Sequence, residues 1–343
     1  MKARNVLPIV LASTLWLVSC GSKPADSSGT GNADPPMFGQ GFLSAGQPVT
    51  GIQPEGMRTA DTSWIKIKHL DLAYASTSAV QKLDLYLPNE GSGPFPLIIE
   101  FHPGGFMTGG KSMGIGPMLE GLKRGYAVAS VGYRLSGEAS FPAAVNDAKA
   151  AVKFLRASAG KYNLDPRRFA AWGSSAGGNL AALVAVSANE PSLVDASLGN
   201  AGVSDSVGAA VDWYGPLDFS SMDAQFKALG KNGSMGPTSS PDSPESKYLG
   251  RTVGTPEARP LAEKANPGSY ISADDPPMYI QHGTEDRNVP ITQSENFARD
   301  LAAAIGADKV VYESIRLAGH GGPLFEAAAN VAKILDFLDR HLK

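Results

Sequence analysis

A single cysteine, Cys20, occurs among the 343 residues, so an intrachain disulfide is excluded. Histidine is also scarce, and the five histidines are scattered along the chain rather than grouped as metal ligands would be. The sequence therefore implies no metal and no organic cofactor. A basic excess is lacking as well, because the formal net charge is −3 and lysines and arginines form no cluster. Nucleic acid is not an expected partner.

The N-terminal apolar run, residues 6–18, is too short to span a bilayer comfortably. It follows Lys2 and Arg4 and ends just before Cys20, an order typical of an export signal. The segment resembles a bacterial lipoprotein signal, in which Cys20 would become the lipidated first residue. We therefore predict a signal peptide over residues 1–19.

The next segment, residues 20–55, is rich in Gly, Ser, Pro and Asp and has few apolar residues in register. Such a composition cannot bury enough surface to fold, which predicts a flexible tether. Residues 56–343 are then the folded domain. We expect the protein to be exported, to face the periplasm or the cell surface, and to contact the membrane only through its lipid anchor.

Within the folded domain, stretches of strand pattern alternate with stretches of helical pattern. Residues 64–72 and 82–87 alternate with period two, which predicts half-exposed antiparallel edge strands. Later apolar runs are nearly continuous, as in parallel strands covered on both faces. Helical periodicity falls in residues 141–155 and 324–342. The pattern predicts an α/β fold with about eight strands, mostly parallel and flanked by helices. The continuous runs are residues 97–101, 127–131, 169–172, 209–214, 277–281 and 310–317.

Residues 216–276 interrupt this alternation. They are rich in Ser, Pro and Gly, with short helical patterns only near residues 224–229 and 256–265. The segment is long for a plain connection, which favours a lid or a substrate-facing insertion.

A glycine-flanked serine forms the strongest candidate nucleophile. Residues 168–172 have a strand pattern, Gly-Ser-Ser-Ala-Gly-Gly follows, and a helical run starts near residue 179. On such a sharp strand-to-helix turn the hydroxyl of Ser175 would project into a cleft, and Gly173 and Gly177 supply the small neighbours that the turn requires. A second G-x-S-x-G match surrounds Ser112, but it follows a glycine-rich loop rather than a strand, and we interpret it as coincidence.

A nucleophilic serine needs a base, and the base needs an acid. His320 follows the last predicted strand between glycines, where a loop could reach back over the sheet. Asp286 lies just beyond another strand end, and the carboxyl ends of strands gather catalytic groups in such sheets. Glu285 is the local competitor. We predict catalysis by Ser175, His320 and Asp286.

The segment His-Pro-Gly-Gly-Phe after residues 97–101 predicts a site that stabilises negative charge. Glycines let backbone N–H groups crowd an oxyanion, and proline has no N–H, so the predicted donors are Gly104, Gly105 and Ala176. His102 is expected to support this loop rather than transfer a proton.

Three aromatic residues near these elements are candidates for substrate contact: Phe106, Trp213 and Tyr214. For the last two, core packing is an equal alternative. Arg134 is expected to pair with a buried carboxylate such as Asp147.

Taken together, these motifs resemble the α/β-hydrolase superfamily from about residue 64 to the C-terminus. They are most similar to hormone-sensitive-lipase-type carboxylesterases and to bacterial feruloyl and acetylxylan esterases. Ser175, Asp286 and His320 follow the chain order of that superfamily. One departure is Pro103, where the family usually has glycine, and it leaves both glycine donors intact. Further similar segments are residues 133–135, 141–144 with Asp147, 165–166 and 212–216.

The resemblance implies a serine carboxylesterase whose substrates are acetyl or feruloyl esters of plant polysaccharide, or small esters. Two alternatives remain open. One is a peptidase similar to prolyl oligopeptidase, although the region before residue 64 is too short for the N-terminal propeller of that family. The other is a surface binding protein on an inactive hydrolase scaffold, which would have no reason to keep all three groups.

Overall fold

A computed structural model describes residues 59–343. The predicted signal peptide, the tether over residues 20–55 and the lipidated Cys20 lie outside the described residues. The described residues belong to one compact unit, Ile52–Lys343. Within residues 59–343, none of the helices combines the length and the apolar character that crossing a membrane requires.

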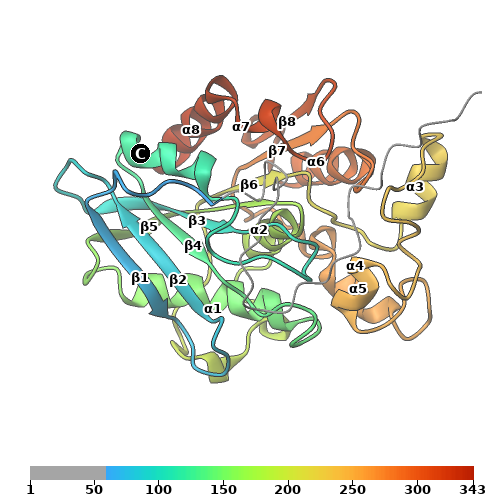
Figure 1. Ribbon diagram of the computed structural model, residues 1–343, viewed down its shortest axis with the longest axis horizontal. Coiled ribbons are helices and arrows are strands. Elements are labelled where there is room, and N and C mark those ends of the chain that lie inside the picture. The colour runs from blue at the N-terminus through green and yellow to red at the C-terminus, as the bar shows by residue number, and fades with distance from the viewer. Residues whose placement is uncertain (1–58) are drawn as a thin grey trace, which may run out of the picture. The chain divides into compact units, whose positions relative to one another are not determined.

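The architecture is built on an eight-stranded sheet with the order β1-β2-β4-β3-β5-β6-β7-β8 (Figure 1). β1 pairs antiparallel with β2 and β2 with β4, whereas every other pair is parallel. The prediction of about eight mostly parallel strands is thus confirmed. The strands are β1 (Ile67–Ala73), β2 (Lys82–Leu87), β3 (Phe95–Phe101), β4 (Ala127–Val131), β5 (Leu164–Ser174), β6 (Ala209–Trp213), β7 (Met278–Gly283) and β8 (Val310–Ile315).

The prediction that both N-terminal strands are half-exposed edge strands is wrong for β2. β2 lies between β1 and β4 and is buried along nearly its whole length. Its alternating pattern misleads because the polar residue Asp84 is itself buried, with its carboxylate 2.6 Å from Nζ of Lys111. A polar residue in a strand is therefore no proof of exposure when a distant cation covers it.

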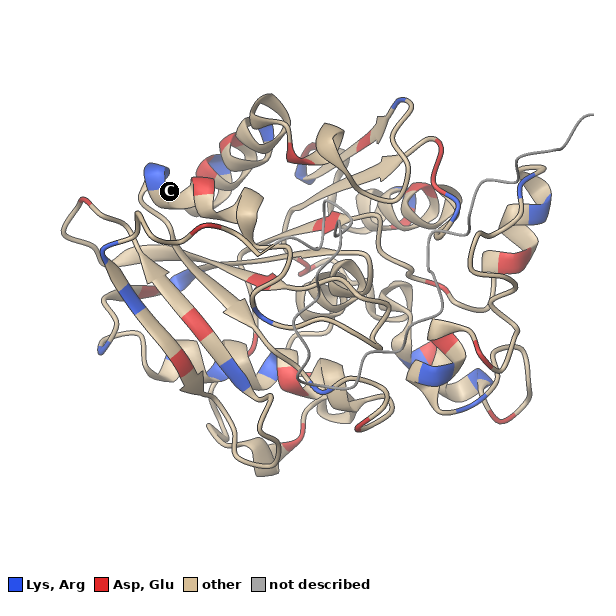
Figure 2. Ribbon diagram, viewed as in Figure 1, with Lys and Arg blue, Asp and Glu red and all other residues tan. Residues whose placement is uncertain are grey.

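Helices cover both faces of the sheet, as the nearly continuous apolar runs of its parallel strands require. One core face packs against α1, α2 and α6, and the other against η2 and α8. Figure 2 shows acidic and basic residues interspersed along these elements. The main helices are η2 (Gly116–Arg124), α1 (Ala143–Ala157), α2 (Ala176–Val186), α6 (Thr292–Ile305), α7 (Pro323–Glu326) and α8 (Ala328–Leu342).

The predicted C-terminal helix is divided into two. α7 ends at Glu326, and Ala327 has an extended backbone (φ −55°, ψ 132°) before α8 begins. Leu324, which the periodicity placed on the buried face, is 48% exposed. The sequence predicts one continuous helix because residues 324–328 match the helical spacing of the residues that follow them.

The register of the sheet gathers the candidate site. Phe101 at the end of β3 lies opposite Gly173 of β5, and Ser174 lies opposite Trp213 at the end of β6. The parallel strands β3, β5, β6, β7 and β8 therefore place the loops that follow them at one edge of the sheet. Four of them matter below: the glycine loop (residues 102–110), the serine turn (174–176), the acid loop (284–289) and the histidine loop (316–322).

The segment predicted as an insertion, residues 216–276, contains three short α-helices and a 3-10 turn, η5 (Pro267–Tyr270), and lies to one side of the sheet (Figure 1). Two of them coincide with the predicted helical patterns, and α4 was not predicted. These helices are α3 (Met222–Ala228), α4 (Pro244–Leu249) and α5 (Arg259–Ala265).

Candidate active site

Ser175 occupies the turn between β5 and α2 in a left-handed backbone conformation, with φ 55° and ψ −122°. Its N–H donates to the carbonyl of Trp213 at 2.8 Å, which fixes the turn to β6. Glycine is required on both sides of the serine, because a side chain at either position would collide with the backbone. A Cβ on Gly173 would lie 1.9 Å from the carbonyl oxygen of Gly177, and one on Gly177 would lie 1.8 Å from that of Phe101. The close packing forces the strained conformation, as in a nucleophile turn.

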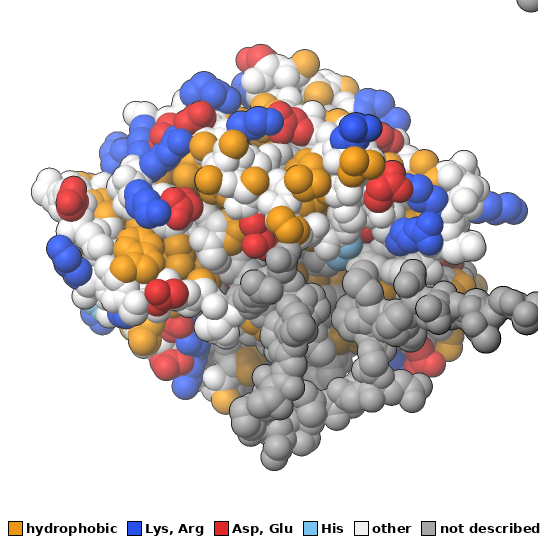
Figure 3. Space-filling view, turned by 45° about the horizontal axis from the view of Figure 1, so that its top comes forward, with side chains coloured by type: hydrophobic (Ala, Val, Ile, Leu, Met, Phe, Trp, Pro, Cys, Tyr) orange, Lys and Arg blue, Asp and Glu red, His pale blue; other side chains and the backbone are white. Residues whose placement is uncertain are grey.

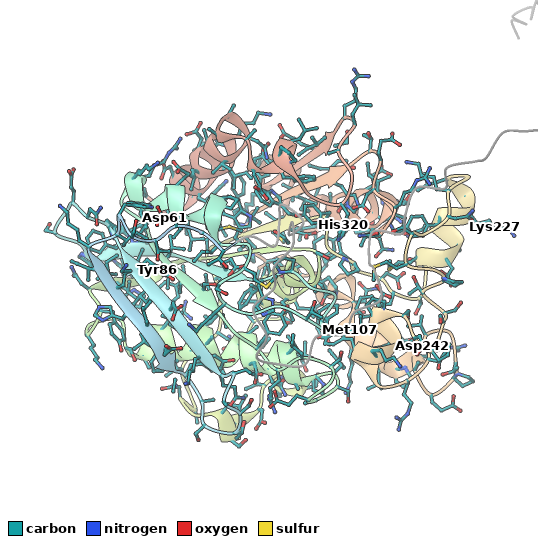
Figure 4. The ribbon with its side chains drawn as sticks, viewed as in Figure 1. Asp61, Tyr86, Met107, Lys227, Asp242 and His320 are labelled. Atoms are coloured by element: carbon teal, nitrogen blue, oxygen red, sulfur yellow. The ribbon has the colours of Figure 1, made fainter. Side chains whose placement is uncertain are left out.

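His320 lies between Ser175 and Asp286. Its Nε2 is 2.8 Å from Oγ of Ser175, and its Nδ1 is 2.7 Å from Oδ2 of Asp286. Figure 4 shows His320 on the loop that follows β8. The structure thus brings the three predicted side chains into one hydrogen-bonded row. The competitor Glu285 is exposed and its carboxylate lies 3.5 Å from Lys231, away from this row.

The carboxyl group of Asp286 is 2% exposed and every side of it meets a donor. Oδ1 accepts hydrogen bonds from the backbone N–H groups of Asn288 (2.7 Å) and Val289 (2.9 Å). Oδ2 faces His320 and also lies 3.3 Å from Nε2 of His282. Burial works to raise the pKa of Asp286, but the neighbouring histidines outweigh it and hold the pKa below its ordinary value. The group is therefore an anion at neutral pH.

The histidine loop is tied to the acid loop and to β6. The N–H of Glu285 donates to the carbonyl of Ala318 at 2.8 Å. The ring of Tyr214, which has φ 44°, meets the His320 ring edge to face at 4.7 Å. Gly321 has φ 94°, and a Cβ there would lie 2.9 Å from the hydroxyl of Tyr214. Tyr214 therefore fixes the position of His320, a role that its proximity in sequence to β6 did not reveal.

The glycine loop presents free amides beside the serine turn. Gly104 and Gly105 both have positive φ, 131° and 60°, and a Cβ on Gly104 would lie 2.0 Å from the carbonyl of Thr108. Gly177 of α2 packs directly on the carbonyls at the start of this loop. Within residues 59–343, the N–H groups of Gly104, Gly105 and Ala176 donate to no other residue. Of these donors, Ala176 lies at the N-terminus of α2, where free N–H groups attract negative charge.

His102 supports the glycine loop from below. It is fully buried, its ring stacks on Tyr133 at 4.1 Å, and its Nδ1 lies 2.8 Å from the carbonyl oxygen of Pro103. Burial lowers the pKa of His102 to about 4, so the ring is neutral at physiological pH. These contacts are those of a structural support.

All three aromatic residues predicted to contact substrate, Phe106, Trp213 and Tyr214, lie in the buried core. Trp213 is 2% exposed and packs between Trp172 (5.2 Å) and Phe325 (5.5 Å). Phe106 is 1% exposed and stacks on Tyr248 of α4 at 3.8 Å. Their large apolar rings gain more from burial than an exposed site could offer, and the sequence pattern did not distinguish the two situations.

The insertion contacts two of the site loops. From α4, Pro244 lies under Gly105, where an added Cβ would come within 3.3 Å, and Tyr248 stacks on Phe106. At the acid loop, the N–H of Ser234 donates to the carbonyl of Arg287 at 2.7 Å. The insertion therefore braces the site.

Two further expectations concern residues outside the site. The predicted pairing of Arg134 with Asp147 is confirmed, because Nη2 of Arg134 lies 2.7 Å from Oδ1 and Nε lies 2.9 Å from Oδ2. Ser112, in the second G-x-S-x-G match, lies exposed in a turn that no α-helix follows directly. Among residues 59–343, no group of three or more His, Cys, Asp or Glu side chains is arranged to hold a metal ion.

Comparison with known proteins identifies the family of the chain. The BD-FAE family model matches residues 83–301, which is more than half of the chain. Esterase LipQ of Mycobacterium tuberculosis is 30% identical over 309 residues, covering 86% of this chain and 68% of LipQ. The probable carboxylic ester hydrolase LipM of the same organism is 28% identical, covering 75% of this chain. The chain spans 57% of the length of LipM.

Solved structures give the same result. A truncated carbohydrate esterase from gut microbiota superposes with a TM-score of 0.69 at 28% identity, covering 83% of this chain and 99% of that one. A bifunctional GH43-CE protein of Bacteroides eggerthii gives 0.70 at 29% identity, covering 80% of this chain and 35% of that one. The fold and these relatives define an α/β-hydrolase of the carboxylic ester hydrolase class. Within that class, the chain belongs to the BD-FAE family.

Proposed function

We propose that this protein is an exported serine esterase whose catalytic residues are Ser175, His320 and Asp286. The observation that carries the proposal is the hydrogen-bonded row from Ser175 Oγ through His320 to Asp286, at 2.8 and 2.7 Å, on a strained strand-to-helix turn. Nucleophile, base and orienting acid at these separations are the arrangement that acyl transfer requires.

The chemistry follows from the positions of the donors and acceptors. Oγ of Ser175 attacks the ester carbonyl while Nε2 of His320 takes its proton. The same Nε2–H then protonates the departing alcohol, which leaves an acyl enzyme. Water then gives a proton to Nε2 and attacks the acyl carbon; the bond from that carbon to Oγ of Ser175 breaks, Nε2–H returns the proton to Oγ, and the acid is released. Asp286 keeps the proton of His320 on Nδ1 and stabilises the imidazolium that forms in each step.

The negative oxygen of each tetrahedral intermediate would be held by the free amides of Gly104, Gly105 and Ala176. Each such donor typically lowers the barrier by about 2.7–4 kcal/mol. The amides of Gly104 and Gly105 need no reorganisation, because both glycines already have the positive φ that this loop conformation requires.

For the substrate, we propose acetyl or hydroxycinnamoyl esters of plant polysaccharide, or small esters of the same acids. The similarity to a carbohydrate esterase from gut microbiota supports this class. An export signal and a lipid anchor at Cys20 would place the enzyme outside the cytoplasm, where such polymers occur. On the face shown in Figure 3, hydrophobic side chains lie among charged ones. Two of the exposed hydrophobic residues, Leu317 in the histidine loop and Leu324 just after it, would suit an apolar part of a substrate.

The test is hydrolysis by the full chain of nitrophenyl acetate, butyrate and octanoate, of methyl ferulate and of acetylated xylan. Ser175→Ala should abolish hydrolysis, and Ser112→Ala is the matched control because it changes the serine of the second G-x-S-x-G match. Release of acetate or ferulate by the unmodified chain and by Ser112→Ala supports the proposal. A folded chain that is inert on every ester contradicts it, and activity on peptide anilides would then favour a peptidase.

Lipid anchoring has its own test. Expression of the full chain and of Cys20→Ser in a bacterium fed a labelled fatty acid should label only the chain that keeps Cys20. Equal labelling of both chains, or of neither, would contradict the anchor.

A further inference from the structure

The row of hydrogen bonds does not end at Asp286. His282, the next-to-last residue of β7, contacts the same carboxylate oxygen, Oδ2, that His320 contacts. Its Nε2 is 3.3 Å from Oδ2 of Asp286 and 3.0 Å from the carbonyl oxygen of Val289. Its Nδ1 is 2.7 Å from Oγ of Ser294 in α6. The side chains of His282 and Ser294 are both fully buried.

Acceptor chemistry fixes the proton on His282. The carbonyl of Val289 and the ionised Asp286 can only accept hydrogen bonds, so Nε2 of His282 carries the proton that faces them. In the neutral ring, Nδ1 then accepts from the hydroxyl of Ser294, which satisfies the tautomer that the two acceptors at Nε2 require. The Nε2–H group of His282 therefore faces two acceptors, the carboxylate of Asp286 and the carbonyl of Val289 in the acid loop.

This sharing restrains Asp286 in two ways. The N–H of Val289 donates to Oδ1 of Asp286 at 2.9 Å, while its carbonyl accepts from His282. His282 therefore positions the acid loop through Val289 and also contacts the carboxylate directly. Of the two oxygens, Oδ2 is the one that His320 also faces, so displacement of His282 would change the orientation of the catalytic base.

We propose that Ser294 and His282 are positioning residues that extend the catalytic row to five members: Ser294, His282, Asp286, His320 and Ser175. The inference rests on the proposed function and adds to it that the carboxylate is oriented from β7 and α6 as well as from its own loop. Neither residue touches the substrate. Both act by holding Asp286 in the orientation that keeps His320 in its active tautomer.

The experiment measures kcat and KM for nitrophenyl acetate and, separately, the rate at which paraoxon phosphorylates Ser175, read by mass spectrometry. The second rate needs no knowledge of the natural substrate. His282→Phe keeps a planar aromatic ring, although a somewhat larger one, and removes both nitrogens, so it should lower kcat and the phosphorylation rate by about tenfold to 100-fold, the effect of a misplaced catalytic group, with KM little changed. His282→Gln retains one donor and one acceptor and should recover most of the rate.

The two positioning residues should behave as one unit. Ser294→Ala alone should slow phosphorylation. It should cause no further loss in the His282→Phe background, because the hydrogen bonds that connect Ser294 to Asp286 are already absent there. His341→Phe is the matched control, since His341 packs on Phe337 in α8, and it should leave both rates unchanged.

Three results would overturn the inference: a folded His282→Phe protein with the unmodified rates, losses that multiply in the double variant, or a His282→Gln protein as slow as His282→Phe. If His282→Phe does not fold, Ser294→Ala and His282→Gln decide, and unchanged rates in Ser294→Ala overturn the inference. A chain that hydrolyses no ester, but whose Ser175 is phosphorylated at rates that depend on His282, contradicts the proposed function and upholds the inference. An unmodified Ser175 that paraoxon does not phosphorylate overturns the inference itself.

Discussion

Replacement of Asp286 by asparagine tests how the acid controls the base. Asparagine has the same shape, but one of its two ends must donate. Oδ1 already accepts from two backbone N–H groups, so the amide NH₂ is placed against His320. Nδ1 of His320 must then accept, which moves the ring proton to Nε2, where it points at Ser175. The base can no longer take the proton of the serine hydroxyl.

The magnitude follows from this loss of the active tautomer. In a serine triad the equivalent change lowers kcat about 10⁴-fold. That factor corresponds to about 5.4 kcal/mol of barrier height, at about 1.36 kcal/mol for each tenfold. The stability cost should be smaller, about 1–3 kcal/mol, because one buried donor of the acid loop or of His282 loses its partner.

The assay compares kcat for nitrophenyl acetate with the melting temperature of the same preparations. Glu285→Gln is the matched control, because its exposed carboxylate lies next to Asp286 in the chain but outside the row. We expect Glu285→Gln to keep full activity. A folded Asp286→Asn protein with more than about a tenth of the unmodified kcat would refute the tautomer argument, since the argument requires a loss of about 10⁴-fold. So would an equal loss in both variants.

Three further predictions follow from the packing. Gly177→Ala should lower the free energy of unfolding by about 3 kcal/mol or more, because its Cβ would lie 1.8 Å from a backbone oxygen; denaturant unfolding checks this. Tyr248→Ala should cost about 3 kcal/mol in the same measurement and also lower kcat, because Phe106 in the glycine loop loses its stacking partner. Burial raises the pKa of Asp212 from 3.8 to about 7, so its protonated form stabilises the fold below pH 3.8 and this contribution is lost as the pH rises through 7. The stability of Asp212→Asn relative to the unmodified protein should therefore increase over that range, by up to about 4 kcal/mol, and a constant difference would contradict the assignment.

The local patterns predicted much of the sheet. β2 and β4 begin and end at the predicted residues, because β2 is followed by Pro88 and β4 lies between Gly125 and Gly132, which limit the apolar runs. The position of β2 inside the sheet could not be predicted, since it depends on Lys111 covering Asp84 from a distant part of the chain. Likewise α4 was missed, because its six residues are too few to show a helical period.

The candidate site divides in the same way. Ser175, Asp286 and His320 could be selected because each follows a strand in a turn with a distinctive composition. His282 and Ser294 carry no such local signal. Only the fold shows that His282 lies beside Asp286. The aromatic residues show the reverse error, because proximity in sequence to a strand end does not decide whether a ring faces the site or the core.

The central claim is that Ser175 is the nucleophile of an ester hydrolase. The most direct measurement is peptide mapping of the full chain after reaction with paraoxon, made alongside the loss of nitrophenyl acetate hydrolysis. The account predicts one phosphoryl group on the peptide that contains Ser175, with hydrolysis lost in proportion to labelling. Labelling at Ser112, or hydrolysis that persists when Ser175 is fully labelled, would contradict it.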